Sequence, residues 1–289
     1  MMLRLTFFLA ACTVHTTTAY SLPTKQPWST QWIAPLPLGL SRLAVRRDDW
    51  PIGAAALHAG EAVICVPDMI TEGERTQLLS AGTARAAAEH ARGVPRSGVE
   101  PTDGVKQDAH SVRLHIPKTL AATEIAMCDT ILARVLRFVD AELPCLSSYL
   151  FASALCDLHE QGQLDFSANE PAINVYYKNG AFNPHKDYCA LTVLIPLSSP
   201  DDGSFSGSGT GFWPPEERRR AGDSSGEPAL VLVPQAGTAM LFSGHVTHAG
   251  MPVAQGTRVV FVASFTRQFG DEDLVDEDVG DADAEETLL

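Results

Sequence analysis

The pattern of apolar and polar residues changes near residue 170, and it predicts a helical half before that point and a β-rich half after it. Two stretches of the first half have the apolar spacing of helices, residues 72–91 and 120–143. The first follows Thr71, which stands three residues before Glu74, the spacing of a capping box. Short strands are expected at 61–67 and 111–116. We therefore expect residues 61–169 to form a mainly helical part that packs against a β core.

After residue 170, short apolar runs recur and are separated by Gly, Pro, Asp and Ser. The runs are 173–177, 191–197, 230–233, 239–242 and 259–265. Evenly spaced short strands favour a β-sandwich or a small barrel, and we place this domain at residues 170–269. Residues 198–228 interrupt the pattern, since they are rich in Gly, Ser, Glu and Arg, and we predict a long loop there. Loops of this length are usually functional or disordered.

The first sixty residues indicate a targeting segment followed by a linker. Arg4 precedes a short apolar run and a Thr-rich stretch, so residues 1–19 are predicted to be a signal that directs the chain to the secretory pathway, either the ER or the extracellular space. A plastid address and a bacterial lipoprotein signal at Leu9-Ala10-Ala11-Cys12 are the alternatives. Residues 20–60 are rich in Pro and Trp and show no period, so we expect an irregular linker or a segment that wraps around the core. No run of about 18 apolar residues is present, and no membrane span is predicted.

The net charge of −14 is concentrated at the C-terminal end. Residues 270–289 contain ten carboxylates and no Lys or Arg, which leaves the rest of the chain at −4. We expect this tail to be disordered and solvated, and a tail that binds a basic partner is the alternative. Nucleic-acid binding is not expected, because it would require a basic face. The six cysteines include no CxxC pair, so buried thiols are expected rather than a disulfide framework or a zinc ribbon, and Cys145–Cys156 is the one pair that could form a disulfide.

Candidate chemistry begins with His185 and Asp187. In an extended strand, residues two apart point to the same face, so an imidazole and a carboxylate would enter one pocket together. Two ligands hold a metal weakly, and the third is expected from His245 or His248. Ten residues after His248, Arg258 lies in an otherwise apolar strand. A guanidinium there needs an anion, which could be a structural Asp or Glu or the carboxylate of a ligand.

Three segments together resemble the iron(II)/2-oxoglutarate-dependent dioxygenase superfamily, in its prolyl 4-hydroxylase-like branch. They are INVYYKNGAFNPHKDYCALTVLIPLS, GTGFW and PQAGTAMLFSGHVTHAGMPVAQGTRVVFVASF. The resemblance covers residues 172–269 strongly and extends weakly upstream. It implies a double-stranded β-helix (jelly-roll) core, α+β or mainly β in class, with supporting N-terminal helices.

Carried over by position, the resemblance implies that His185, Asp187 and His248 are the iron ligands. Such a set leaves three coordination positions for a bidentate 2-oxo acid and dioxygen. Arg258 would pair with the distal carboxylate of 2-oxoglutarate. The resemblance further implies that Thr192 and Tyr177, or Tyr176 in its place, line the 2-oxoglutarate pocket.

The implied reaction converts 2-oxoglutarate and O2 to succinate and CO2 while a C–H bond is hydroxylated, with Fe(II) and with ascorbate as a supporting reductant. A prolyl or other protein side chain is the substrate that the resemblance suggests, and a small molecule is the other choice. Many collagen-type members carry Lys where this chain has Arg258, so close kinship with those enzymes is not implied. Two other hypotheses stay open: a cupin-type jelly-roll metalloenzyme that does not use 2-oxoglutarate, and a catalytically silent binding module.

Overall fold

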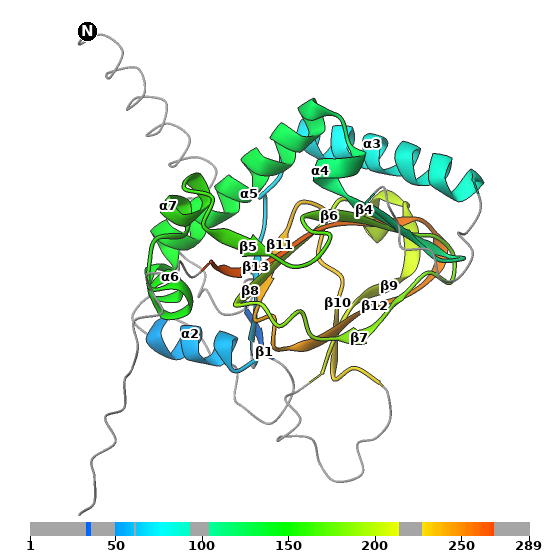
Figure 1. Ribbon diagram of the computed structural model, residues 1–289. Coiled ribbons are helices and arrows are strands. Elements are labelled where there is room, and N and C mark those ends of the chain that lie inside the picture. Colours follow the sequence, from blue (N-terminus) through cyan, green and yellow to red (C-terminus); the bar gives the residue numbers. More distant parts are fainter. Residues whose placement is uncertain (1–32, 36–49, 61, 93–103, 214–226, 269–289) are drawn as a thin grey trace, which may run out of the picture.

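Two antiparallel sheets face one another, and the chain passes between them repeatedly from residue 172 onwards (Figure 1). The computed structural model describes residues 33–35, 50–60, 62–92, 104–213 and 227–268. The central strands of the larger sheet are, in order, β11 (Ala239–Phe242), β8 (Leu191–Pro196), β13 (Arg258–Arg267) and β6 (Ala172–Tyr176). The smaller sheet contains, in order, β10 (Leu230–Leu232), β9 (Phe205–Trp213), β12 (Thr247–Gly256) and β7 (Phe182–His185).

Except at the hairpin of β9 and β10, each of these strands is followed along the chain by a strand of the opposite sheet. That alternation defines the double-stranded β-helix, or jelly roll. The fold predicted from the sequence is therefore confirmed, and its eight strands all lie after residue 170 as expected.

Strands from the first half of the chain extend the larger sheet at both edges. At one edge, β4 (Ser111–His115) pairs with β6, and β3 (Val105–Gln107) pairs with β4. At the other edge, β2 (Ala62–Val66) pairs with β11, and β1 (Ile33–Pro35) pairs with β2. A short strand, β5 (Leu164–Phe166), pairs with the end of β13. The first half is thus continuous with the β core as well as packed against it.

Helices cover the outer face of the larger sheet (Figure 1). They are α2 (Trp50–His58), α3 (Glu72–Ala91), α4 (Ile116–Thr119), α5 (Ala122–Glu142), α6 (Pro144–Phe151) and α7 (Leu155–Glu160). The two long helices begin and end within two residues of the predicted bounds. The capping box is present, because the Thr71 side chain accepts from the Glu74 backbone and the Glu74 carboxylate accepts from the Thr71 backbone. No helix among the described residues is long and apolar enough to cross a membrane.

The side-chain alternation of β13 separates a structural core from the interior of the barrel. Val259, Phe261, Ala263 and Phe265 point outward into the core shared with the helices. Val260 points inward to the core between the two sheets. Arg258, Val262 and Ser264 share that parity, so Arg258 faces the inside of the barrel although it stands in an apolar strand.

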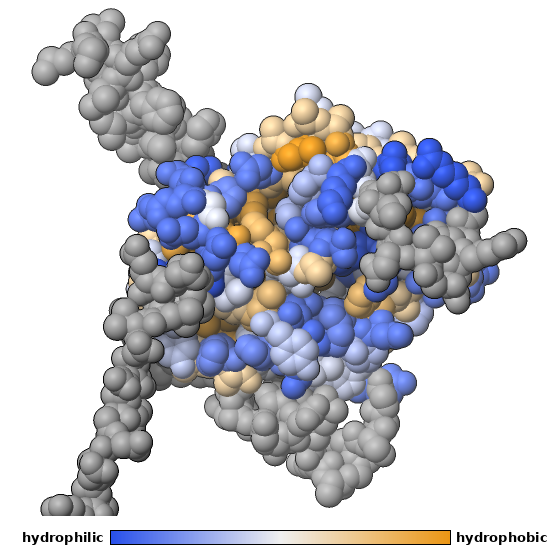
Figure 2. All heavy atoms as spheres, viewed as in Figure 1, coloured by the Kyte–Doolittle hydropathy of each residue, from blue (hydrophilic) through white to orange (hydrophobic). Residues whose placement is uncertain are grey.

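On the face drawn in Figure 2, hydrophobic residues gather toward the top, over the helices.

Two expectations from the sequence are wrong. The predicted linker at 20–60 contains β1 and helix α2, whose buried Ala54 and Leu57 pack into the core. The predicted loop at 198–228 contains β9, which is rich in glycine yet pairs along its length with β12. The expectation of free thiols is confirmed for the described cysteines, and Cys145 and Cys156 do not form a disulfide. The predictions of a signal at 1–19 and a disordered tail at 270–289 lie outside the described residues.

Candidate active site

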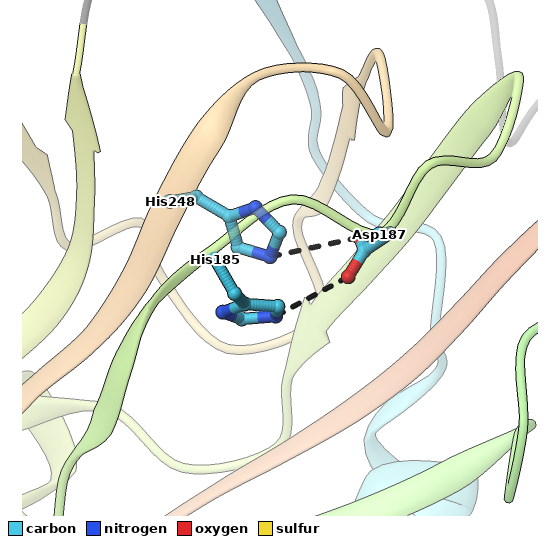
Figure 3. A group of neighbouring side chains, drawn as sticks. All are labelled: His185, Asp187 and His248. Atoms are coloured by element: carbon cyan, nitrogen blue, oxygen red, sulfur yellow. Dashed lines mark ion pairs between the residues drawn. The ribbon is translucent and has the colours of Figure 1, made fainter.

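His185, Asp187 and His248 meet at one end of the smaller sheet (Figure 3). His185 is the last residue of β7, and its Cα is paired across the sheet with that of His248 on β12. Asp187 follows two residues after His185, on the connection to β8. His185 Nε2 lies 3.2 Å from Asp187 Oδ1, and His248 Nε2 lies 3.6 Å from Asp187 Oδ2. The ligand atoms of the three side chains all lie within 4.8 Å of one another.

Backbone carbonyls set the orientation of both imidazoles. His185 Nδ1 lies 2.8 Å from the Asn183 carbonyl oxygen, and His248 Nδ1 lies 3.2 Å from that of Val246. A carbonyl can only accept, so each Nδ1 carries a proton, and in the neutral imidazole each Nε2 then keeps its lone pair. Both lone pairs are therefore available to a metal at the point where the rings converge, and such an outer hydrogen bond is usual for metal-binding histidines.

The spacing of the three ligands fits a first-row metal. Such metals bind imidazole nitrogen and carboxylate oxygen at about 2.0–2.2 Å, so ligands at right angles lie about 3 Å apart. The 3.2 Å and 3.6 Å separations are close to that value. Two imidazoles and one carboxylate on one face are the donor set of non-haem Fe(II) oxygenases, and they leave positions open for other ligands.

The site is preset in the protonation state that a metal requires. Burial alone would raise the pKa of Asp187, but hydrogen bonds and charge from His185, His248 and Thr192 outweigh it and lower the pKa to about 2. Burial lowers the pKa of His248 to about 4. At neutral pH the carboxylate is ionised and the His248 imidazole is neutral, which is how each binds a metal.

Arg258 lies in the same cavity as the three candidate ligands. Its side chain is buried, and Nη2 donates to Thr210 Oγ1 at 2.9 Å. Within the part of the chain that the structure describes, no carboxylate pairs with this guanidinium. Burial lowers the pKa of Arg258, the direction expected for a cation without an anion, yet a guanidinium remains charged. The cavity therefore contains a positive charge suited to the carboxylate of a ligand.

Space for that ligand is left by Gly250 on β12. A Cβ at this position would lie 3.3 Å from the Tyr176 hydroxyl oxygen and 3.4 Å from Arg258 Nη1. The guanidinium carbon lies 5.5 Å from the centre of the Tyr176 ring. The Tyr176 ring, the Arg258 guanidinium and the space left by Gly250 thus lie together in the cavity. His185, Asp187 and His248 line the same cavity.

Two predicted pocket residues lie elsewhere. Tyr177 faces the helices, with its ring 4.9 Å from that of His90, because neighbouring residues of a strand point to opposite faces. Tyr176, the alternative, lines the cavity. Thr192 is buried behind the candidate metal ligands, and its hydroxyl donates to Asp187 Oδ2 at 2.6 Å. The structure thus places Thr192 against the candidate ligand Asp187 and not along the cavity wall.

The sequence reasoning missed several polar residues of the cavity. Thr210 was hidden in the predicted long loop, although a Thr between two glycines in GTGFW was a visible signal. Arg113, Glu170 and Asn174 also line the cavity and are joined by hydrogen bonds from the Arg113 guanidinium. His245, the rival of His248, is exposed and stacks edge-on near Tyr188, so it is not one of the converging ligands.

Comparison with known proteins gives matches among solved structures alone. No family model matches the sequence, and no curated protein does. A collagen prolyl hydroxylase of Paramecium bursaria Chlorella virus-1 is 15% identical, with a TM-score of 0.44, and covers 74% of this chain and 99% of its own. A 2-oxoglutarate–Fe(II) oxygenase of Burkholderia pseudomallei is 16% identical, with a TM-score of 0.46 and coverage of 79% and 94%. A prolyl-4-hydroxylase of Pseudomonas putida is 14% identical, with a TM-score of 0.43 and coverage of 78% and 100%. Similarities of this size do not identify a reaction, which has to be argued from the residues of the site.

Proposed function

We propose that this protein is an Fe(II)- and 2-oxoglutarate-dependent dioxygenase that hydroxylates a C–H bond. The observation that carries the proposal is Arg258, a buried guanidinium without a carboxylate partner among the described residues, in one cavity with two imidazoles and a carboxylate. The metal ligands alone would suit several jelly-roll oxygenases. The unmatched buried cation specifically requires an anionic ligand inside the barrel.

Each part of the cavity has a role in this reaction. His185, Asp187 and His248 would hold Fe(II) by one face, and the iron, when bound, supplies the activation of O2 that is coupled to decarboxylation of 2-oxoglutarate. Arg258 and Thr210 would bind the distal carboxylate of 2-oxoglutarate, the guanidinium by paired charge-assisted hydrogen bonds. The buried rings of Tyr176 and Phe212 lie beside the guanidinium and His248 and keep water away from these groups. The overall balance is 2-oxoglutarate, O2 and R–H giving succinate, CO2 and R–OH.

The substrate, the reductant and the location belong to the same proposal. We infer a prolyl or other protein side chain as substrate, ascorbate as the reductant that restores oxidised iron, and the secretory pathway as the location. The resemblance of residues 172–269 supports the first two, and the composition of residues 1–19 supports the third. A +16 Da product after incubation with a peptide library, detected by mass spectrometry, would support the choice of a peptide substrate, whereas products from a small-molecule panel alone would contradict it.

The reaction is tested by measuring succinate formed from 2-oxoglutarate in the presence of Fe(II) and O2. We expect His185→Ala to abolish succinate formation, since one of three ligands is lost. We expect Arg258→Gln to raise the KM for 2-oxoglutarate on the order of 100-fold, since charge-assisted hydrogen bonds contribute about 1.5–3 kcal/mol each. Metal binding should survive the Arg258 change, and Arg92→Gln on the exposed end of α3 is the matched control.

The same measurements also separate the proposed reaction from the two other hypotheses, the cupin-type metalloenzyme and the silent binding module. An oxygenase that binds metal but does not consume 2-oxoglutarate, with Arg258→Gln unchanged in activity, would indicate the cupin-type reaction. A protein that binds no iron by calorimetry would indicate the silent binding module.

A further inference from the structure

The two oxygens of the Asp187 carboxylate have different surroundings. Oδ2 lies 2.6 Å from the Thr192 hydroxyl and 3.2 Å from the Ser264 hydroxyl. Oδ2 also lies 3.6 Å from His248 Nε2, whereas Oδ1 lies 3.2 Å from His185 Nε2, and among the described residues no hydroxyl or backbone N–H is bonded to Oδ1. A carboxylate with two donors on one oxygen has only the other oxygen fully free for a metal.

The two hydroxyls belong to the larger sheet, opposite the strands that supply the histidines. Thr192 on β8 and Ser264 on β13 are directly paired across the sheet, and both are fully buried. Their oxygens lie 3.2 Å apart. Since Thr192 has one proton and its contact with Asp187 is the shorter, its hydroxyl donates to Asp187, and Ser264 Oγ can donate to the same oxygen.

A buried ion pair fixes the position of Ser264. The Ser264 backbone N–H donates to one oxygen of the Glu170 carboxylate, and the Arg113 guanidinium binds the other at 2.5 Å. Only small parts of the Glu170 and Arg113 side chains are exposed, 4% and 16%. The backbone that carries the Ser264 hydroxyl is therefore held by a buried ion pair.

We propose that Thr192 and Ser264 are positioning residues that reserve Asp187 Oδ2 for hydrogen bonds, so that Asp187 would hold a metal through Oδ1. This rests on the proposed iron site. A carboxylate can bind a metal through one oxygen or two, and binding through both would occupy one of the positions that a three-ligand face leaves open. The hydroxyl pair thus keeps room for a bidentate oxo acid and a further ligand at the same ion.

The test is a titration of the metal-free protein with Co(II), followed by calorimetry and by visible absorption. Thr192→Val removes one hydroxyl without changing the volume much, and Ser264→Ala removes the other. We expect each change to weaken Co(II) binding about tenfold or more, as is usual for residues that support metal ligands. The Co(II) absorption bands should also shift, because the carboxylate gains freedom to bind through both oxygens. Thr192→Ser should restore the wild-type bands and affinity.

Ser147→Ala is the matched control. Ser147 lies on α6 and does not line the cavity, and its buried hydroxyl donates to the Asp140 carboxylate at 2.6 Å. It should leave Co(II) binding and the bands unchanged. A Thr192→Val protein with wild-type affinity and bands would overturn the inference and leave the proposed function intact. A wild-type protein that binds no Co(II) or Fe(II) would overturn both.

A second measurement does not depend on metal affinity. At saturating Co(II), the dissociation constant of 2-oxoglutarate should rise in Thr192→Val and Ser264→Ala, because Asp187 then competes for a coordination position. An unchanged constant in both variants would contradict the inference, even if metal binding itself had weakened.

Discussion

Gly250 defines the space in which the carboxylate partner of Arg258 would lie. Its Cβ position is within 3.4 Å of both the Tyr176 hydroxyl and the Arg258 guanidinium, so an added methyl group narrows the cavity at its cationic end. We predict that Gly250→Ala raises the KM for 2-oxoglutarate about tenfold, since overpacking at a tight site costs about 1–2 kcal/mol. Succinate formation measured against 2-oxoglutarate concentration checks this.

The control for Gly250→Ala is Gly73→Ala, because nothing lies within 4 Å of a Cβ at residue 73 in the first turn of α3. Gly73→Ala should leave the KM unchanged. Co(II) affinity should be unchanged in both variants, since neither residue touches the metal ligands. A Gly250→Ala protein with wild-type KM would show that the oxo acid binds elsewhere in the cavity.

At the level of single residues, the sequence identified the candidate site residues whose chemical type is unusual at their position in a strand. The His-x-Asp pair and the lone Arg258 stand out because an extended strand gives a fixed two-residue period and an apolar strand rarely contains a charge. Tyr177 and Thr192 were misplaced because their roles depend on the register and the face of β6 and β8. Tyr176 is paired across the sheet with Arg258, and this long-range pairing cannot be read from local pattern.

Among the secondary-structure elements, the ion pair of Glu74 and Arg134 joins the start of α3 to α5. Two hydrogen bonds of 2.7 Å and 2.8 Å connect the carboxylate to the guanidinium, and a third from the Thr71 backbone closes the capping box. Burial alone would raise the pKa of Glu74, but the Arg134 and Thr71 contacts outweigh it and lower the pKa from 4.5 to about 2. The pair therefore stabilises the fold only while Glu74 is ionised.

The sign of the pH dependence follows from the lowered pKa. The contribution is fully present above pH 4.5, the unfolded value, and is lost as the pH falls towards 2. We predict that wild-type protein loses about 1 kcal/mol more stability than Glu74→Gln between pH 5.5 and pH 3, after allowance for solvent screening. Urea unfolding at the two pH values measures the difference.

Arg134→Met should flatten the pH dependence in the same way, because it removes the main group that lowers the Glu74 pKa. If Glu74→Gln kept the wild-type slope, the acid sensitivity would belong to other carboxylates.

The elements that the sequence predicted are those with a strong local period. Helices α3 and α5 have amphipathic spacing and, for α3, a capping box. Strand β9 lacks such a signal because its glycines suggest a loop, and its strand conformation is imposed by pairing with β12. At Gly211 a Cβ would lie 2.6 Å from the Met251 sulfur, so close packing between strands favours glycine there, whereas Gly207 and Gly209 have positive φ angles that favour glycine.

In the whole molecule, the candidate metal site joins the two sheets. His185 and His248 come from β7 and β12 of the smaller sheet, whereas Asp187 is bonded to Thr192 and Ser264 of the larger one. A bound ion would therefore link the walls of the barrel near one end. Because an unfolded chain does not hold these three ligands together, metal binding should stabilise the fold.

We predict that Mn(II), a redox-stable substitute for Fe(II), raises the melting temperature of the metal-free protein. At a concentration of 100 times its dissociation constant, binding to the folded state alone adds about 2.7 kcal/mol, which corresponds to about 5–10 °C for a chain of this size. Differential scanning calorimetry before and after EDTA treatment measures the shift. His185→Ala should show no Mn(II) shift, while Arg258→Gln should keep the Mn(II) shift but lose the further increase that 2-oxoglutarate gives the wild type. If Mn(II) raised the melting temperature of His185→Ala as much as that of the wild type, the ion would bind away from the three converging side chains. If 2-oxoglutarate raised the melting temperature of Arg258→Gln as much as that of the wild type, the Arg258 guanidinium would not be the group that binds the oxo acid.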